Sequence, residues 1–253
     1  MWMRMLGALA VLALTSLQAQ ARHAPRDVTV EIVDERGGRF EQFPVASGGE
    51  AYRAYLQAER GAPYRIRIRN HTGERIGVVV AVDGRNIISG QRSELERHEP
   101  MYVLSPWERE EFAGWRTSLD DVHEFYFTDW KDSYAEAFRD RSAKGVIAVA
   151  VYREKGERLR PHYGEREGKA APAPGASAKR SDEAGTGFGD RRYDPAVRVE
   201  FEAQRTASSQ VFLKYEWRET LCRKGVGRCD RGRERNRFWD DDGLAFAPHP
   251  PRR

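Results

Sequence analysis

The stretch YRIRIRNHTGERIGVVVAV (Tyr64–Val82) decides the fold class. Its first six residues alternate, so that one Tyr and two Ile lie on one face of an extended chain and three Arg on the other. That pattern is typical of a half-buried antiparallel strand. Residues 70–73 have a turn composition, and the β-branched run of residues 76–82 favours a strand buried on both faces. We expect two strands here, and the simplest product is a meander of adjacent strands.

Strand patterns continue on both sides of this stretch. Residues 50–59 mix helix-favouring side chains with two Tyr and lie between strands, so we expect a strand. One short helix is expected at residues 133–140, because Ser133 and Glu136 have capping-box spacing. Further strand candidates are residues 28–33, 86–89, 101–104, 111–115, 125–128 and 146–152. About eight or nine short strands predict an all-β fold, either a sandwich or a barrel, and we favour an antiparallel β-sandwich.

The first 21 residues have the three parts of a secretory signal peptide. Arg4 is the early positive charge, an apolar stretch runs from Met5 to about Leu17, and the small residues Ala19 and Ala21 follow. A membrane anchor is the alternative, but about 13 apolar residues are fewer than the ~20 that a span needs. We expect cleavage at residue 21, a periplasmic or secreted location, and no transmembrane segment afterwards.

Charge excludes one class of protein. Charged residues make up 32% of the chain, the formal net charge is +4, and the only long apolar run is the N-terminal one. An integral membrane protein with several spans is therefore excluded. The remaining apolar residues are numerous enough to build a buried core.

Export changes the expected state of Cys222 and Cys229, the only two cysteines. Outside the cytoplasm two nearby thiols tend to oxidise. A metal site or a redox pair is the alternative, but the spacing is neither C-x-x-C nor a zinc pattern, and no His lies between Leu221 and Arg237. We predict a structural disulfide, with no metal and no cofactor.

Composition divides the rest of the chain. Between Gly168 and Gly189, 15 of 22 residues are Gly, Ala, Pro or Ser. Such a segment can bury too little apolar surface to offset the entropy lost on ordering it. Alternating stretches at residues 197–201 and 211–215 predict a hairpin, which must dock on the first sheet to be stable. The expected organisation is a signal peptide (1–21), a β-sandwich domain (22–155), a flexible, disordered linker (156–192), the hairpin (193–217) and a basic, disulfide-stapled tail (218–253).

Several short motifs, spread with gaps over roughly residues 64–201, share one resemblance. They are residues 70–75, 78–84, Asn86, 102–104, 114–118, 127–128, 132–135, 145–147 and the Gly-rich element 185–189. Together they resemble a group of uncharacterised exported proteins of proteobacteria. In the Gly-rich element Phe188 stands where that group more usually has His, which argues against a catalytic or metal-binding His there. The resemblance implies export and one β-rich unit; the group has no established activity and implies no catalytic residue.

Acidic residues gather in the middle of the chain, where residues 94–140 hold 13 carboxylates against five Lys or Arg. The most pointed group is Asp120-Asp121-Val122-His123-Glu124. It offers metal ligands or an acid/base pair, as in an envelope hydrolase. The simpler interpretation is a turn that Ser118 caps, with acids near its exposed N–H groups. No nucleophile elbow, P-loop, H-E-x-x-H or EF-hand pattern occurs, and we predict no catalytic residue.

Aromatic residues in the same region allow two interpretations. They could stack on a carbohydrate, or they could fill the core, which is the commoner use of aromatics at strand positions. Their spacing does not separate the two interpretations. The residues are Tyr102, Trp107, Trp115, Tyr126, Trp130 and Tyr134.

The C-terminal region is basic, with eight Lys or Arg against three acids between Arg218 and Arg237 and aromatic residues at its edges. Guanidinium groups beside aromatic planes suit phosphate and sulfate groups, so a polyanion is one candidate ligand. A solvated tail that offsets the acidic segment is the other interpretation. No nucleic-acid partner is expected, because export removes it and Asp240–Asp242 would repel it. The candidate ligand-binding residues are Arg218, Arg223, Lys224, Arg228, Arg231, Arg233 and Arg235.

Taken together, the sequence predicts an exported, soluble, non-catalytic binding or structural module of the cell envelope. The expected partner is an envelope component, an anionic one if the tail selects it. A hydrolase using carboxylates around Asp120–Glu124, and a polyanion-binding protein acting through the tail, stay open. Convergence of Asp120, Asp121, His123 and Glu124 on one concave pocket would favour the enzyme, and dispersal would favour the module.

Overall fold

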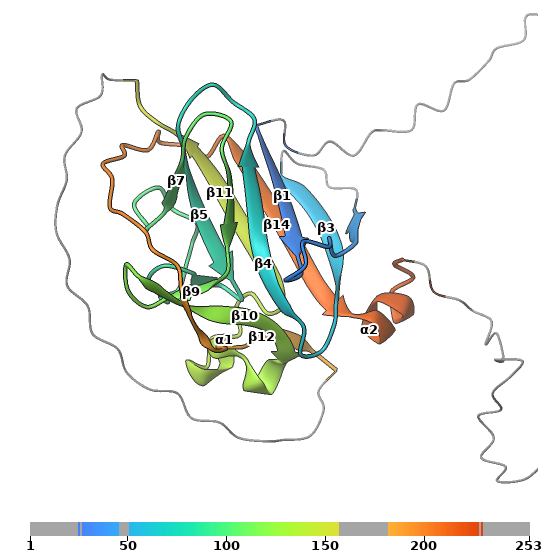
Figure 1. Cartoon of the computed structure of the whole chain (residues 1–253). Coiled ribbons are helices and arrows are strands. Elements are labelled where there is room, and N and C mark those ends of the chain that lie inside the picture. Colours follow the sequence, from blue (N-terminus) through green and yellow to red (C-terminus); the bar gives the residue numbers. More distant parts are fainter. Residues whose placement is uncertain (1–24, 26, 46–50, 157–181, 228, 230–253) are drawn as a thin grey trace, which may run out of the picture.

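The computed structural model describes residues 25, 27–45, 51–156, 182–227 and 229, and these form two packed β-sheets (Figure 1). The first sheet has the strand order β1-β4-β10-β12, with β8, β9 and β13 attached. Its strands are β1 (Val28–Val33), β4 (Pro63–Asn70), β8 (Arg109–Phe112), β9 (Gly114–Arg116), β10 (Asp121–Asp129), β12 (Ala184–Thr186) and β13 (Arg191–Tyr193).

The second sheet has the order β2-β3-β14-β11-β5-β6, with β7 attached to β5. Its strands are β2 (Gln42–Pro44), β3 (Tyr52–Ala58), β5 (Ile76–Val82), β6 (Arg85–Asn86), β7 (Tyr102–Leu104), β11 (Val146–Arg153) and β14 (Ser209–Trp217). Three short helices complete the described residues: η1 (Trp130–Asp132), α1 (Tyr134–Ala137) and α2 (Arg218–Arg223). The expected all-β sandwich is confirmed, and so is the strand expected at residues 50–59, which is β3.

The deciding stretch becomes β4 and β5. The inward residues of β4 are buried while its arginines are partly exposed, and β5 is buried along its whole length. The expected meander is wrong, because β4 and β5 lie in different sheets. An apolar run such as β5 needs cover on both faces. Its outer face is covered by Met101 and Phe201, which pack on a small cluster with Val79 and Ala150.

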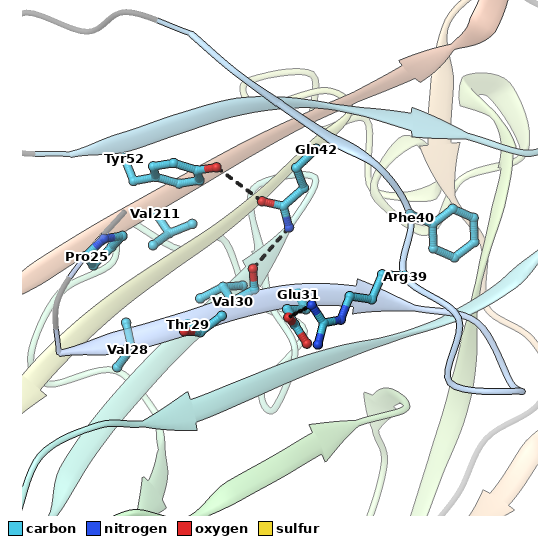
Figure 2. A pocket seen from close by; sticks show the side chains of 10 residues that line it. All are labelled: Pro25, Val28, Thr29, Val30, Glu31, Arg39, Phe40, Gln42, Tyr52 and Val211. Carbon is cyan, nitrogen blue, oxygen red and sulfur yellow. Dashed lines mark hydrogen bonds and ion pairs between the residues drawn. The ribbon is translucent and has the colours of Figure 1, made fainter. Parts of the chain in front are cut away.

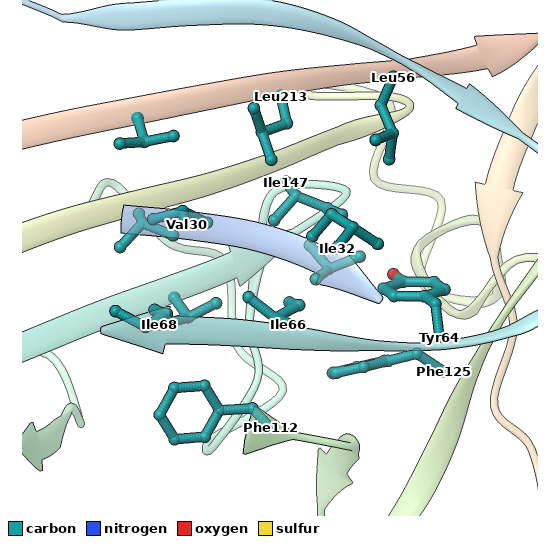
Figure 3. Close-up of a cluster of buried hydrophobic side chains, with 14 of the residues drawn as sticks. Val30, Ile32, Leu56, Tyr64, Ile66, Ile68, Phe112, Phe125, Ile147 and Leu213 are labelled. Atoms are coloured by element: carbon teal, nitrogen blue, oxygen red, sulfur yellow. The ribbon is translucent and has the colours of Figure 1, made fainter. Parts of the chain in front are cut away.

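The main core lies between the sheets (Figure 3). Ile32, Ile66 and Phe125 face it from the first sheet, and Leu56 and Leu213 face it from the second; all are fully buried. Each such side chain contributes about 1.5–3 kcal/mol of burial free energy. The sandwich is therefore held mainly by alternating apolar side chains of both sheets.

The predicted C-terminal hairpin is half right. Residues 211–215 lie in β14, but residues 197–201 form no strand, and Val197 and Val199 are exposed. Instead β14 pairs antiparallel with β11 and parallel with β3, in the middle of the second sheet. Alternation identifies a strand and its buried face but not its partner. Two long partners bury β14 better than one short one would.

The predicted linker (156–192) is wrong in its last part. Residues 157–181 lie outside the described residues, as do residues 1–21, but β12 and β13 pair with β10. Ala184 and Thr186 are buried. A Cβ on Gly187 would lie 2.1 Å from the ring of Tyr126, and one on Gly185 would lie 2.6 Å from Cβ of Ser133. The glycines here allow close packing, a use that composition does not reveal.

The short helix and the aromatic residues agree with the simpler interpretations. The Ser133 side chain accepts a hydrogen bond from the Glu136 N–H at the start of α1, so the predicted N-cap is confirmed. Trp115 and Trp130 are buried, which supports their interpretation as core residues. Trp107, by contrast, is 63% exposed.

One buried polar network joins the two sheets. The Asp83 carboxylate accepts hydrogen bonds from the backbone N–H groups of Gly145 (2.7 Å) and Thr186 (2.8 Å) and from the Tyr215 hydroxyl (2.6 Å). The Thr186 hydroxyl lies 2.8 Å from the hydroxyls of both Tyr64 and Tyr215. Burial raises the pKa of Asp83 to about 6, although these hydrogen bonds favour the charged form.

Candidate functional site

The predicted acidic cluster lies at the start of β10, where arginines of β13 neutralise it. The Asp121 carboxylate accepts from Arg191 Nε at 2.8 Å and from Ser118 Oγ at 3.1 Å, and Glu124 pairs with Arg192. The hydrogen bond from Arg191 lowers the pKa of Asp121. The two carboxylates therefore serve as ion-pair partners between β10 and β13.

The rest of the cluster is also held by structural contacts. His123 Nδ1 lies 2.8 Å from the Gly189 carbonyl oxygen, and its ring stacks on Phe188 with centroids 4.0 Å apart. The Asp120 N–H donates to Ser118 Oγ, as expected of a capped turn. Within the described residues no group of three His, Cys, Asp or Glu could hold a metal. These contacts favour the structural interpretation of the cluster.

Of the predicted ligand-binding residues of the tail, Arg228, Arg231, Arg233 and Arg235 lie outside the described residues. Arg218 begins α2. Arg223 lies 3.9 Å from an Asp182 carboxylate oxygen, and Lys224 Nζ donates to Glu216 at 2.5 Å. The described part of the chain therefore does not test the seven residues as a group, and within it Arg223 and Lys224 already have acidic partners.

The two cysteines are joined. Cys222, in α2, and Cys229 form a disulfide with Cα atoms 5.4 Å apart. Leu221 on the same helix is buried, so the disulfide ties the chain beyond α2 back to a helix that packs on the sandwich. This confirms the predicted pairing.

A groove that the sequence analysis missed opens between β1 and the chain that leads to β2 and β3 (Figure 2). We call it the edge groove. Its volume is about 240 Å³. The residues that line it are Pro25, Val28, Thr29, Val30, Glu31, Arg39, Phe40, Gln42, Tyr52 and Val211. Apolar side chains of both sheets form its floor.

Within the described residues, β1 has a neighbouring chain on the groove side over only part of its length, and the groove lies where that neighbour departs. After a turn at residues 34–38, the chain runs back beside β1, and the Phe40 N–H donates to the Ile32 carbonyl at 2.9 Å. The chain then leaves to pair with β3 as β2. Beyond Phe40 a side chain still contacts β1: Gln42 Nε2 donates to the Val30 carbonyl at 3.0 Å.

The mouth of the edge groove is polar. Arg39 pairs with Glu31 at 3.1 Å on the outer side of β1. The Tyr52 hydroxyl donates to Gln42 Oε1 at 3.4 Å, and burial raises the pKa of Tyr52. The groove can thus hold an apolar group while polar atoms remain at its entrance.

A signal for the groove does exist in the sequence. Gly37–Gly38 is a hairpin turn pair between residues 28–33 and the stretch that begins at Phe40. It would place residues 39–44 beside β1. It does not show that this partner leaves at Gln42, because that depends on competition from β3.

No protein-family model, curated protein or solved structure matches the chain. No helix in the described ranges is long and apolar enough to cross a membrane. The edge groove is therefore assigned from its geometry, as a site where an apolar floor meets a small number of placed polar groups.

Proposed function

We propose that the protein is an exported, non-catalytic binding module of the cell envelope, periplasmic or secreted, which holds an apolar group of its ligand in the edge groove. The observation that carries this proposal is the groove itself, with its apolar floor and polar mouth. Its volume of about 240 Å³ is below the range of roughly 300–1,000 Å³ typical of sites for whole small ligands. It therefore suits one part of a larger partner.

Two features support export. The N-terminal 21 residues have the pattern of a signal peptide, and the Cys222–Cys229 disulfide is the state that an oxidising compartment favours. Both agree with a periplasmic or secreted protein.

The groove supports binding better than the acidic cluster supports hydrolysis. A general acid/base pair needs carboxylates free to reach a substrate, whereas Asp121 and Glu124 are paired with Arg191 and Arg192. Polyanion binding through the tail has less support, because Arg223 and Lys224 are already paired with acidic residues.

Photo-cross-linking in the native host tests the proposal. A photoreactive phenylalanine replaces Tyr52 at the groove mouth, and the matched control replaces Tyr193, an exposed tyrosine on β13 of the other sheet. We expect an envelope-fraction adduct from position 52, none from position 193, and a mature N-terminus at Arg22. Equal labelling at both positions, or recovery of the uncleaved chain from the cytosol, would contradict the proposal.

A further inference from the structure

We infer that the ligand of the edge groove is an extended polypeptide strand of a partner protein, which adds to the free edge of β1 and places apolar side chains in the groove. This inference rests on the proposed function. It is carried by the backbone groups of β1 that face the groove and by the spacing of those groups.

Hydrogen bonds show which β1 groups face away from β4. In an antiparallel strand, the N–H and C=O of one residue point to the same side, and this side alternates along the chain. The Val30 and Ile32 carbonyls accept from the side chain of Gln42 and the backbone of Phe40, so they face outward. Val28 has the same parity. Among the described residues, β1 pairs with β4 and, at Val33, with Arg39 only.

Between residues 28 and 31 of the described chain, three outward backbone groups are therefore left along the edge: the N–H and C=O of Val28 and the N–H of Val30. Residues 28 and 30 are about 6.6–6.8 Å apart along the strand, which is also the repeat of a second polypeptide chain. A strand added antiparallel would exchange two hydrogen bonds with Val28 and accept one from Val30. The Gln42 side-chain amide donates to the Val30 carbonyl at the place where a backbone N–H of an added strand would lie. An amide N–H therefore fits this position of the edge.

The side chains of the added strand would divide between two environments. Residues opposite Val28 and Val30 would face the groove floor, which includes Phe40 and Val211. The residues between them would face the outer side with Thr29 and Glu31. The partner segment therefore has apolar and polar residues in alternation. A free apolar small molecule would fill the floor but would form none of these three backbone hydrogen bonds, whereas an added strand forms all three.

The probe is an acetylated and amidated peptide, Lys-Thr-Val-Thr-Val-Thr-Lys, made in three forms. In one form the two valines are N-methylated, and in the matched control the two flanking threonines are N-methylated instead. The residues whose apolar side chains face the groove floor are also those whose N–H groups point toward β1. N-methylation of the valines therefore blocks pairing with β1, and N-methylation of the threonines does not. Binding is followed by titration and by hydrogen exchange at the Val28 and Val30 amides of the mature protein.

We expect the unmodified and threonine-methylated peptides to bind within about threefold of one another and to slow exchange at Val28 and Val30 at least about tenfold. The valine-methylated peptide should bind at least about tenfold more weakly. Equal binding of all three peptides, absence of binding, or unchanged exchange overturns the strand inference. Cross-linking from position 52 would still support the proposed function in each of those cases. Protection that appears without peptide and rises with protein concentration would identify a second copy as the occupant and also overturn the inference.

A pair of protein variants checks the same point from the other side. Val30→Pro removes the free edge N–H, and Val30→Ala keeps it while losing the side chain; an edge strand tolerates Pro at an outward N–H. We expect the Pro variant to bind the peptide about threefold to tenfold more weakly than the Ala variant, as loss of one hydrogen bond implies. Equal affinities of two folded variants would overturn the role of Val30.

Discussion

Two regions of this sandwich differ in whether their polar groups have hydrogen-bond partners. Around Asp83, segments far apart in the sequence meet, and the donors of Gly145, Thr186 and Tyr215 all end on one carboxylate. At the edge groove, β1 keeps outward backbone groups, and no strand of the described chain lies on that side of Val28. Satisfied and buried polar groups fix a structure, whereas accessible, unsatisfied ones are available to a partner. Substitutions in the first region should therefore change stability, and substitutions in the second should change binding.

The largest effect is expected from Asp83→Ala. It leaves the two buried backbone N–H groups without an acceptor, takes away the Tyr215 hydroxyl's bond to the carboxylate, and should lower the free energy of unfolding by about 3–5 kcal/mol. Asp83→Asn keeps one acceptor oxygen but turns an amide toward a donor, so we expect about half that loss. Urea denaturation at pH 7 measures both. Glu41→Gln, at an exposed position, is the control and should change stability by less than about 0.5 kcal/mol. A stable Ala variant would show that the network does not hold the sheets.

The pH dependence of stability is the next largest effect. The pKa of Asp83 is raised from 3.8 to about 6, so the folded state binds this proton more tightly than the unfolded state does. Its contribution to stability is present below about pH 4 and is lost as the pH rises through 6, by up to about 3 kcal/mol. The stability difference between wild type and Asp83→Asn should therefore grow as the pH falls from 7 to 4. A difference independent of pH would refute the raised pKa.

Close packing of the Gly-rich element (residues 185–189) predicts a smaller loss of stability on substitution. In Gly187→Ala the new methyl group would lie 2.1 Å from the Tyr126 ring, and the required shift should cost about 1–3 kcal/mol. A Cβ on Gly156 would meet no described atom within 4 Å, so Gly156→Ala is the matched control and should change stability by less than about 0.5 kcal/mol. Thermal unfolding compares the two. Equal midpoints would mean that Gly187 does not lie against the Tyr126 ring in solution.

The same contrast explains what the sequence could predict. Alternation in residues 64–69 and the apolar run of residues 76–82 were sufficient for the strands and their buried faces, because those depend on local period. The partner of each strand depends on chain segments far away. Composition misassigned residues 184–192, since a glycine needed for close approach to Tyr126 looks the same as a glycine in a linker.

The Asp83 network and the edge groove were harder still to predict. Asp83 has the appearance of a turn residue beside Gly84, and only the arrival of Thr186 and Tyr215 makes it a buried acceptor. The edge groove depends on where the chain leaves β1. That point is set by the pairing of β2 with β3, which no local pattern in residues 28–44 shows.

The smallest stability effect, and the sharpest test of the comparison, is expected at Gln42. Gln42→Ala removes the donor to the Val30 carbonyl, but this acceptor lies at an open edge where water can replace the amide. We expect a loss of no more than about 1 kcal/mol, well below that of Asp83→Ala. The variant also frees one more outward group of β1, so the threonine–valine peptide should bind about threefold more tightly. If binding weakens instead, Gln42 contacts the ligand directly, and the free edge of β1 is shorter than its backbone pattern implies.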